Sequence, residues 1–329
     1  MNLLASVASD PAFDFVRPAL DPKAASAILS KELGRRVDVI DLRVTRHKAG
    51  RRCLIEFDIR EADGRTVSVV GKVRVKGANI AAFQLLQELW NRGFNDAAAD
   101  GIRVPQPLKT IAALRMILLR KEPGLPASEL ITSGDGMDVA RRMAEAAFKL
   151  HTAVLAPRKT HTLADELQIL TERLGQAAQL RPLWSQRITA VLADCRELAR
   201  PLPPAQSTGI HRDFYPGQVL VHGNQCCLLD LDLFSEGDPA LDIGNFIGHI
   251  AEFGLRKHAS AEVFCDREQA MVERYLQLSP ATSPAAIGIY RLLTLARHIF
   301  ISTQFPDRQH STERLLEYCE QQLQSTRIR

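Results

Sequence analysis

The chain has 329 residues, of which 46% are hydrophobic, a composition typical of a globular protein with one large domain or two lobes. Its 42 lysines and arginines exceed its 38 aspartates and glutamates by only four, which favours neither a nucleic-acid partner nor an anionic membrane surface. None of the six cysteines forms a C-x-x-C pair, so a zinc site and a disulfide framework are not indicated. The first ten residues lack a signal-peptide pattern and no apolar run approaches the ~18 residues of a membrane span, so we expect a cytoplasmic protein.

The first third of the chain predicts a mainly antiparallel sheet within residues 37–120. Apolar and polar side chains alternate over residues 40–45 and 53–59, and a third strand-like run follows at 67–75. Such alternation places one face of a strand on a core and leaves the other face polar. The Asp-Gly pair at 63–64, between the second and third runs, is a strong hairpin signal.

The spacing of the apolar residues changes in the rest of the chain. A helical pattern covers residues 80–90, and a short apolar run at 115–119 predicts one further strand. Residues 121–124 then form a turn or hinge signal that contains Pro-Gly. Beyond it the apolar spacing is helical, and the predicted helical stretches are 139–154, 163–198 and 262–323.

Residues 210–246 carry the clearest chemical pattern. A His-Arg-Asp tripeptide ends at Asp213, and Gln218 follows five residues later. Two apolar runs flank the Gly-Asn turn at 223–224 and predict a hairpin that delivers Asp230 at its far end. A loop and a hairpin that returns beside it can therefore bring Asp213, Gln218 and Asp230 together.

Phosphoryl transfer needs few protein groups of this kind. One carboxylate orients or deprotonates the acceptor hydroxyl, oxygen ligands hold Mg²⁺ on the phosphates, and a cation holds the α- and β-phosphates. In this chain Asp213 is the candidate catalytic base, and Gln218 and Asp230 are the candidate metal ligands. A single loop aspartate is more often a solvated surface group, but the ordered set of residues favours a catalytic role.

This segment resembles the aminoglycoside phosphotransferase and choline kinase family. Its His-x-Asp and the amide five residues later resemble the H-x-D-x-x-x-x-N motif of that family, and the residues around Asp230 resemble its I-D-[WF]-[ED] motif. Residues 237–242 match G-D-P-x-x-D, and weaker similarity extends over most of residues 40–250. Gln218 stands where the family usually has asparagine, but it keeps the carbonyl oxygen. Arg212 stands where the family usually has glycine or another small residue. Arginine at this position resembles the His-Arg-Asp motif of protein kinases instead.

The resemblance implies an α+β, bilobal protein-kinase-like fold. Residues 1–118 correspond to an N-terminal lobe with an antiparallel sheet on the nucleotide-phosphate side, 119–126 to a hinge, and 127–329 to a larger helical lobe with the catalytic loop and the acceptor site. It also implies ATP and Mg²⁺ as cofactors. The implied partner is a small hydroxylated acceptor that is aminoglycoside-, choline- or sugar-like, with no nucleic acid and no membrane.

The strand at 67–75 resembles the V-A-I-K strand of kinases. Val70 and Lys72 share one face of this strand, so Val70 is the candidate contact for adenine and Lys72 for the α- and β-phosphates. Lys76 lies on the same face and is the rival of Lys72. A kinase lysine usually pairs with a glutamate on the next helix, and Glu88 is the nearest acid there.

The sequence is compatible with three functional classes. The first is a kinase for a small molecule, which we favour. The second is a protein kinase, suggested by His-Arg-Asp. Against it, the Gly-Asp-Pro motif begins only seven residues after Asp230, which leaves little room for a segment on which a peptide docks. The third is a catalytically weak or inactive nucleotide-binding relative, suggested by Gln218 and by the missing glutamate in the predicted helix.

The charges of the C-terminal part leave the class of acceptor open. Aminoglycoside-binding relatives use acidic pockets for cationic sugars. The acids in the corresponding part of this chain are Glu252, Glu262, Asp266 and Glu268. The bases among them are Arg256, Lys257, Arg274, Arg291 and Arg297.

Overall fold

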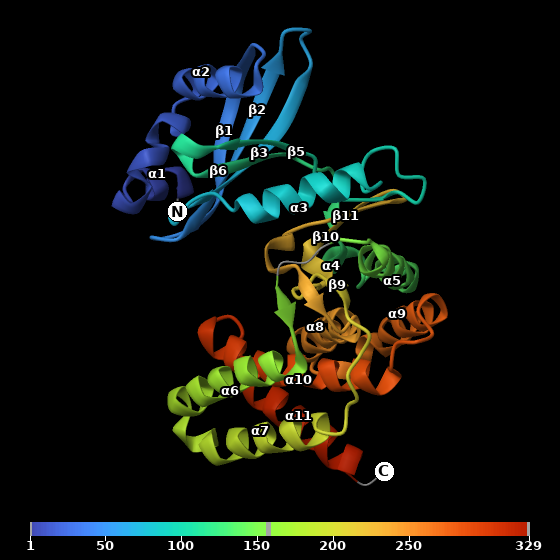
Figure 1. Cartoon of the computed structure of the whole chain (residues 1–329). Helices are drawn as coiled ribbons and strands as arrows, with labels where there is room; N and C mark the ends of the chain where they lie inside the picture. Colours follow the sequence, from blue (N-terminus) through green and yellow to red (C-terminus); the bar gives the residue numbers. More distant parts are fainter. Residues whose placement is uncertain (1, 156–158, 328–329) are drawn as a thin grey trace. The chain divides into compact units, whose positions relative to one another are not determined.

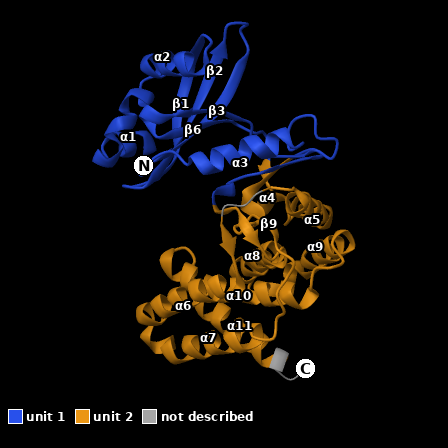
Figure 2. Cartoon of the chain, viewed as in Figure 1, with its two compact units in different colours: residues 1–124, 222–232 blue, residues 125–221, 233–329 orange. Residues whose placement is uncertain are grey.

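The computed structural model describes residues 2–155 and 159–327. The chain divides into two compact units, residues 1–124 with 222–232 and residues 125–221 with 233–329 (Figures 1 and 2). The return of residues 222–232 to the first unit is a feature that the sequence analysis did not predict. The lobe and hinge boundaries named above stay a prediction.

A five-stranded sheet in the order β1-β2-β3-β6-β5 forms the centre of the first unit, and every neighbouring pair is antiparallel. Its strands are β1 (Val37–Lys48), β2 (Arg52–Glu61), β3 (Thr66–Arg74), β5 (Pro107–Ile111) and β6 (Met116–Arg120). The four predicted strands are confirmed, and β5 was missed. Pro107 opens this edge strand, where a missing N–H removes no bond from the interior of the sheet.

Three N-terminal helical segments, which the sequence analysis did not predict, accompany this sheet. They are α1 (Leu3–Ala8), the 3-10 helix η1 (Pro11–Leu20) and α2 (Pro22–Leu33). Phe13 and Leu29 of these segments join Ile55, Phe57 and Val69 of the strands in one buried hydrophobic cluster. The hydrophobic core therefore lies on one face of the sheet, and the polar residues of the candidate site lie on the other.

The helix predicted at 80–90 and the hairpin predicted around 223–224 are both present, and a short strand that the sequence analysis did not predict accompanies them. Helix α3 (Ile80–Asn91) is capped by Asn79, whose side chain accepts a hydrogen bond from the backbone N–H of Ala82. Strand β4 (Ile102–Arg103) pairs in parallel with β11 (Gln225–Leu228). Strand β10 (Val219–His222) precedes β11, and the predicted Gly-Asn turn joins them with Gly223 at a φ of 55°.

The second unit consists mostly of helices (Figure 1). They are α4 (Ala127–Leu130), α5 (Gly136–Thr152), α6 (Leu163–Leu180), α7 (Ser185–Ala199), α8 (Ala240–His258), α9 (Cys265–Leu278), α10 (Pro284–Gln304) and α11 (Thr312–Arg327). Its strands are β7 (Leu125–Pro126), which pairs with β10, and the sheet β8-β12-β9 (Thr160–His161, Ser235–Gly237 and Thr208–Ile210). The predicted helical stretch at 163–198 is two helices, because proline at 182 interrupts it.

Helices α8 and α10 pack closely against each other. A Cβ atom at Gly244 would lie 2.5 Å from the Cβ of Tyr290, and one at Gly248 would lie 2.9 Å from the Cβ of Thr294, so both glycines allow this approach. Among the described residues, α10 is the one helix long and apolar enough to cross a membrane, and 67% of its apolar window is buried inside the protein. Such burial is typical of the core helix of a globular protein.

Candidate functional site

The register of the sheet gathers cations on the face opposite the core. Arg46 of β1, Leu54 of β2 and Lys72 of β3 are direct cross-strand neighbours. Lys48, Arg52 and Arg74 form the next row. Because neighbouring side chains on one face lie about 5 Å apart, the two rows make a continuous basic surface.

A β-bulge explains why Arg46 belongs to this surface. The register shifts between Val44 and Arg46, so Arg46 pairs with Leu54 and not with the core residue Cys53. A single extra residue in a strand turns the following side chain to the other face. Simple alternation along β1 therefore could not place Arg46 at the site.

A small cavity of about 40 Å³ adjoins this basic surface. It is lined by Arg46, Arg52, Cys53, Leu54, Lys72, Val73, Asp230 and Asp232. Three cations and two carboxylates therefore meet within the first unit. Cations suit phosphate oxygens, and carboxylates suit a metal ion that accompanies the phosphates.

Lys72 and Asp230 form an ion pair, with 3.1 Å between Nζ of the lysine and Oδ1 of the aspartate. Their side chains are 25% and 24% exposed, so both can be reached from solvent. Burial opposes ionisation of Asp230, but the charge of Lys72 prevails and lowers the pKa of this carboxyl. Asp230 also has a φ of 53°, in the left-handed region that few non-glycine residues adopt. Such backbone strain is common at functional sites.

The ion-pair partner of Lys72 is therefore Asp230, which follows β11 and lies far from Lys72 in the sequence. Glu88, the nearest acid on the next helix, pairs with Arg92 instead. Lys76, the rival lysine, lies exposed in the turn after β3. Val70 is half-buried on the same face as Lys72 and pairs with Leu119 of β6.

Asp232 attaches the segment after β11 to two other elements of the first unit. It accepts hydrogen bonds from the guanidinium group of Arg74 and from Nδ2 of Asn79, the latter over 3.1 Å. These bonds attach the segment after β11 to β3 and to the cap of α3. Asp232 therefore fixes the backbone that carries Asp230.

The turn between β1 and β2 is held from the N-terminal segments. Asp10 accepts hydrogen bonds from the backbone N–H of Gly50 over 2.8 Å and from His47 Nε2 over 3.1 Å. The other ring nitrogen of His47 lies 2.9 Å from the Ser6 hydroxyl oxygen. These contacts fix the turn that continues into the basic rows of β1 and β2.

In the second unit, Asp242 braces the loop that contains Asp213. The buried carboxylate of Asp242 accepts the backbone N–H of His211 over 2.7 Å and that of Arg212 over 2.8 Å. It also lies 2.9 Å from His151 Nε2. Asp242 therefore supports the loop that contains Asp213. Arg212 of this loop has a φ of 68°, in the left-handed region that few non-glycine residues adopt.

Replacement of Asp242 by asparagine is expected to destabilise the protein by about 2–4 kcal/mol, because an amide cannot accept all three bonds of the buried carboxylate. Burial opposes ionisation of Asp242, but the bonds from His151 and the loop outweigh it and lower its pKa. Its stabilising effect is thus present above the pKa of ordinary aspartate and is lost as pH falls through the lower native value.

Urea unfolding of parent and variant at pH 7 and pH 3 measures this effect. The difference in unfolding free energy is expected to shrink at pH 3. The exposed Asp138→Asn is the control and should change stability by less than about 0.5 kcal/mol. An Asp242→Asn protein as stable as the parent at pH 7 would contradict the bracing role.

The structure brings Asp213 and Gln218 together within the second unit. Gln218 Nε2 donates a hydrogen bond to Asp213 Oδ2 over 3.2 Å. Asn245 Nδ2 donates to the carbonyl of Phe214 over 2.9 Å, and the ring of Phe214 packs on that of Phe246. The Gln218 amide nitrogen faces Asp213, so its carbonyl oxygen points away from that carboxylate and suits a metal ligand.

Each unit contributes one candidate oxygen ligand of a type that Mg²⁺ takes in proteins. A carboxylate at Asp230 and an amide carbonyl at Gln218 are ligand types that Mg²⁺ takes, usually with substrate phosphates and water completing the shell. Over residues 2–155 and 159–327 there is no cluster of three or more His, Cys, Asp or Glu side chains able to hold a metal by themselves. Lys72 and Asp230 belong to the first unit, and Asp213 and Gln218 to the second.

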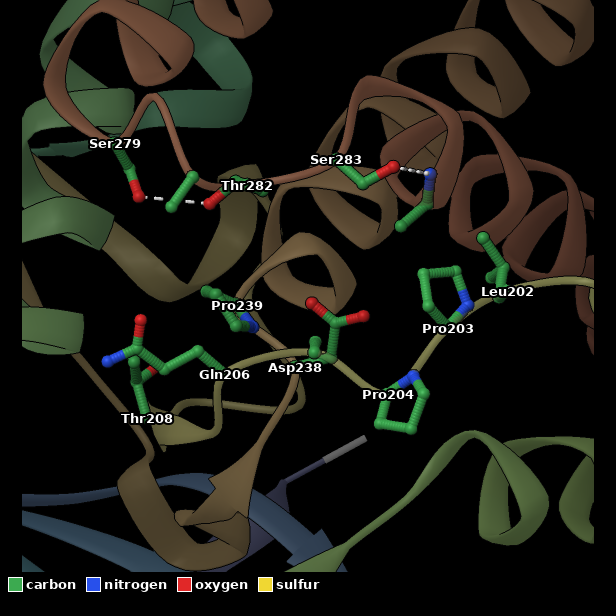
Figure 3. Close-up of a pocket in the computed structure, with 13 residues that line it drawn as sticks. Leu202, Pro203, Pro204, Gln206, Thr208, Asp238, Pro239, Ser279, Thr282 and Ser283 are labelled. Carbon is green, nitrogen blue, oxygen red and sulfur yellow. Dashed lines mark hydrogen bonds between the residues drawn. The ribbon is translucent and has the colours of Figure 1, made fainter.

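A larger cavity, of about 180 Å³, lies elsewhere in the second unit. Figure 3 shows the Asp238 carboxylate in it among Pro203, Pro204 and Pro239. Burial raises the pKa of Asp238. Neither Asp213 nor Gln218 lines this cavity. The size of a cavity alone therefore does not identify the candidate functional site.

Solved structures with a similar fold are phosphotransferases of the protein-kinase-like class. A choline/ethanolamine kinase family protein from Mesorhizobium loti has a TM-score of 0.58 and 13% identity, over 96% of this chain and 94% of that one. An amicoumacin kinase bound to AMP-PNP, Ca²⁺ and its ligand has a TM-score of 0.59 and 14% identity, over 85% and 88%. A thermostable mutant of an aminoglycoside phosphotransferase, in ternary complex with AMP-PNP and hygromycin B, has a TM-score of 0.59 and 16% identity, over 92% and 98%. These likenesses confirm the predicted α+β, protein-kinase-like fold class.

The sequence itself identifies the family. Residues 80–276 match the model described as the phosphotransferase enzyme family, which is more than half of the chain. The protein belongs to this family, and the predicted resemblance is confirmed. No curated protein matches the chain significantly.

Proposed function

We propose that the protein is a kinase that transfers the γ-phosphoryl group of ATP to a hydroxyl group of a small molecule in a Mg²⁺-dependent reaction. The observation that carries this proposal is the basic surface of the sheet, where Lys72 and its cross-strand neighbours adjoin the carboxylate of Asp230. Cations beside a metal-binding carboxylate are what a nucleoside triphosphate needs. Family membership supports the same reaction type.

The nucleotide is assigned to the first unit. Lys72 is the ligand of the α- and β-phosphates, and Arg46 and Arg52 add charge-assisted contacts to phosphate oxygens. Val70 contacts the adenine ring from the same face of β3. Asp230 and Gln218 are the residues that would hold Mg²⁺, and the ion would neutralise negative charge on the phosphates of the nucleotide.

The acceptor is assigned to the second unit. Asp213 accepts the proton of the acceptor hydroxyl, whose oxygen bonds to the γ-phosphorus while the bond to the leaving ADP oxygen breaks. Gln218 keeps the Asp213 carboxylate in place through its amide N–H. The solved structures bound to a nucleotide analogue together with hygromycin B or amicoumacin support a nucleotide and a small acceptor as the two substrates. We propose a cytoplasmic location, in keeping with the buried state of α10.

A peptide acceptor is disfavoured by the chain after Asp230. The 3-10 helix η5 (Leu231–Leu233) and strand β12 follow directly, and α8 begins at Ala240. No long segment lies between Asp230 and α8 on which a peptide could dock. We therefore keep the small molecule as the acceptor.

The role of the basic surface is tested by Arg52→Gln. Loss of one charge-assisted phosphate contact is expected to raise the KM for ATP about tenfold, which corresponds to about 1.4 kcal/mol. The KM for the acceptor should not change, because that contact is made to the nucleotide only. Steady-state kinetics with each substrate varied in turn measures both constants.

The matched control for Arg52→Gln is Arg60→Gln. Arg60 lies on the same strand and the same face as Arg52, but it pairs with Thr66 at the far end of the sheet. The substitution Arg60→Gln removes the same charge from the protein as Arg52→Gln does. Equal effects of the two substitutions on the KM for ATP would mean that net charge, and not a local phosphate contact, is responsible.

A further inference from the structure

A chain of buried hydrogen bonds leads from helix α9 to the loop that contains Asp213. The hydroxyl oxygen of Tyr275 in α9 lies 2.6 Å from Nδ1 of His151 near the end of α5. Nε2 of the same imidazole lies 2.9 Å from Oδ2 of Asp242 in α8. The carboxylate of Asp242 in turn accepts two backbone N–H groups of the loop. Every member of this chain belongs to the second unit.

The three side chains that form this chain are shielded from water. The side chains of His151 and Asp242 are 2% and 1% exposed, and Tyr275 is 1% exposed. At such positions water cannot replace a lost hydrogen bond, so each polar atom depends on its protein partner. The ring of Tyr275 also meets that of His151 edge-on, with 5.6 Å between centroids and 80° between planes. The imidazole is therefore held by Tyr275 on one side and by Asp242 on the other.

The chemistry of the two end groups fixes the direction of both hydrogen bonds. Burial opposes ionisation of Asp242, but the bonds from His151 and the loop lower the pKa of this carboxyl, so at neutral pH it only accepts hydrogen bonds. Nε2 of His151 must therefore be the donor. Burial raises the pKa of the Tyr275 hydroxyl, so this group keeps its hydrogen and donates it to Nδ1. Tyr275 thereby stabilises the tautomer and the ring orientation of His151 that serve Asp242.

The loop needs this support because its backbone is strained. Arg212 has a φ of 68°, and a residue with a Cβ atom stays in the left-handed region only where the surrounding structure enforces it. The bond from the backbone N–H of Arg212 to Asp242 is one such constraint. Arg212 directly precedes Asp213, so a rearrangement of this peptide moves the candidate base. A displacement of about 1 Å in a reacting group can cost about 10²-fold in rate.

We infer that Tyr275 is a positioning residue for phosphoryl transfer, which acts on Asp213 through His151 and Asp242. The inference rests on the proposed function and extends its machinery to helix α9. Loss of the tyrosine hydroxyl leaves Nδ1 of His151 without its donor in a buried place. The imidazole then has no single preferred orientation, and Asp242 loses a fixed donor. The strained peptide before Asp213 is consequently free to relax.

Hydrogen–deuterium exchange of the full chain, resolved to single amides by mass spectrometry, tests this connection without any need for activity. Tyr275→Phe removes only the hydroxyl oxygen. We expect the backbone amides of His211 and Arg212 to exchange at least about tenfold faster in this variant, because their acceptor is no longer held in place. Unchanged exchange at both amides would overturn the inference.

The matched control for Tyr275→Phe is Tyr318→Phe. The Tyr318 hydroxyl also lies in the second unit, but it accepts a hydrogen bond from Arg291 over 3.3 Å. Its loss should change exchange at the two loop amides by less than about twofold. Equal acceleration of exchange by the two substitutions would also overturn the inference, because it would report a general loss of stability.

Steady-state kinetics separates positioning from a merely structural role. In Tyr275→Phe we expect kcat per folded enzyme to fall about tenfold and the KM for ATP to stay within about twofold, because the nucleotide is assigned to the first unit. In a His151→Gln background, Tyr275→Phe should change kcat by less than about twofold, since the tyrosine acts through that ring.

Two kinetic results would overturn the inference. One is a lower midpoint of thermal unfolding in Tyr275→Phe with an unchanged kcat. The other is a second tenfold loss of kcat when Tyr275→Phe is added to His151→Gln. Failure of the proposed function has a different signature. Faster exchange of the loop amides in Tyr275→Phe, together with no ATP-dependent transfer by the parent to any acceptor, would count against that function and not against the connection between Tyr275 and the loop.

Discussion

Replacement of Asp213 by asparagine is expected to remove most of the transfer activity and to leave ATP binding nearly unchanged. Asparagine keeps the size of the side chain and can still accept the bond from Gln218. It cannot take the proton of the acceptor hydroxyl. A general base contributes roughly 10²–10⁴-fold to the rate, which corresponds to about 3–5 kcal/mol of transition-state stabilisation.

The loss should appear in kcat and not in the KM for ATP. Charge in a loose phosphoryl-transfer transition state lies mainly on the phosphoryl oxygens, so Asp213 matters less for nucleotide binding than the cations do. Calorimetry with ATP and Mg²⁺ measures binding, and steady-state kinetics measures kcat. Circular dichroism and the midpoint of thermal unfolding check that the variant is folded. A variant with a kcat close to that of the parent would remove Asp213 from the mechanism.

The second large effect is expected at the Lys72–Asp230 pair. Lys72→Met leaves Asp230 without its cation and removes the phosphate ligand, so ATP affinity should fall with or without Mg²⁺. Loss of one member of a charge pair costs about 2–5 kcal/mol. The low end applies because about a quarter of each side chain is exposed, and 2 kcal/mol is roughly 30-fold in affinity.

Asp230→Asn should behave differently. Its loss of ATP affinity is expected only when Mg²⁺ is present, because the carboxylate acts through the metal. Titration calorimetry of the variants, in Mg²⁺ and in a chelator, separates the two roles. Lys76→Met is the matched control, since Lys76 carries the same charge four residues away in an exposed turn. Undiminished affinity in Lys72→Met with a large loss in Lys76→Met would reverse the assignment.

The parts of the fold with a simple period could be predicted from the sequence. Alternation identified the strands that became β1, β2 and β3, because one face of each is buried and the other is not. Strand β6 was identified as a short apolar run, and four of its five residues are buried. The N-terminal helices were missed. The segment Pro11–Leu20 is a 3-10 helix with a proline inside it, so it does not show the spacing of an α-helix. The proline at the start of β5 concealed that strand in the same way.

The site was predictable where residues are close in the sequence and not where they are distant. Asp213 and Gln218 lie in one motif, and their hydrogen bond spans five residues. The contact between Lys72 and Asp230 spans 158 residues, so spacing along the chain could not pair them. A search for a glutamate on the next helix led to Glu88, which binds Arg92. Arg46 was missed for another reason, since a bulge reverses the face on which it lies.

The charges of the C-terminal part also could not be interpreted from the sequence alone. Counting acids and bases along the C-terminal part gave a mixed result, because a count does not show which charges neutralise each other. The structure pairs Glu252 with Arg256 and Glu268 with Arg291. Arg297 likewise pairs with Glu166 of α6, so most of the charges that the count contained compensate one another.

The most direct test of the account is to follow the γ-phosphoryl group itself. Phosphorus NMR of the protein with ATP, Mg²⁺ and a panel of small hydroxylated molecules records where that group goes. The expected result is a new phosphate-monoester signal that grows with ADP in the parent and is absent with Asp213→Asn. Consumption of ATP to inorganic phosphate alone, or a monoester signal of equal growth in the variant, would contradict the claim that this loop transfers phosphate to a small acceptor.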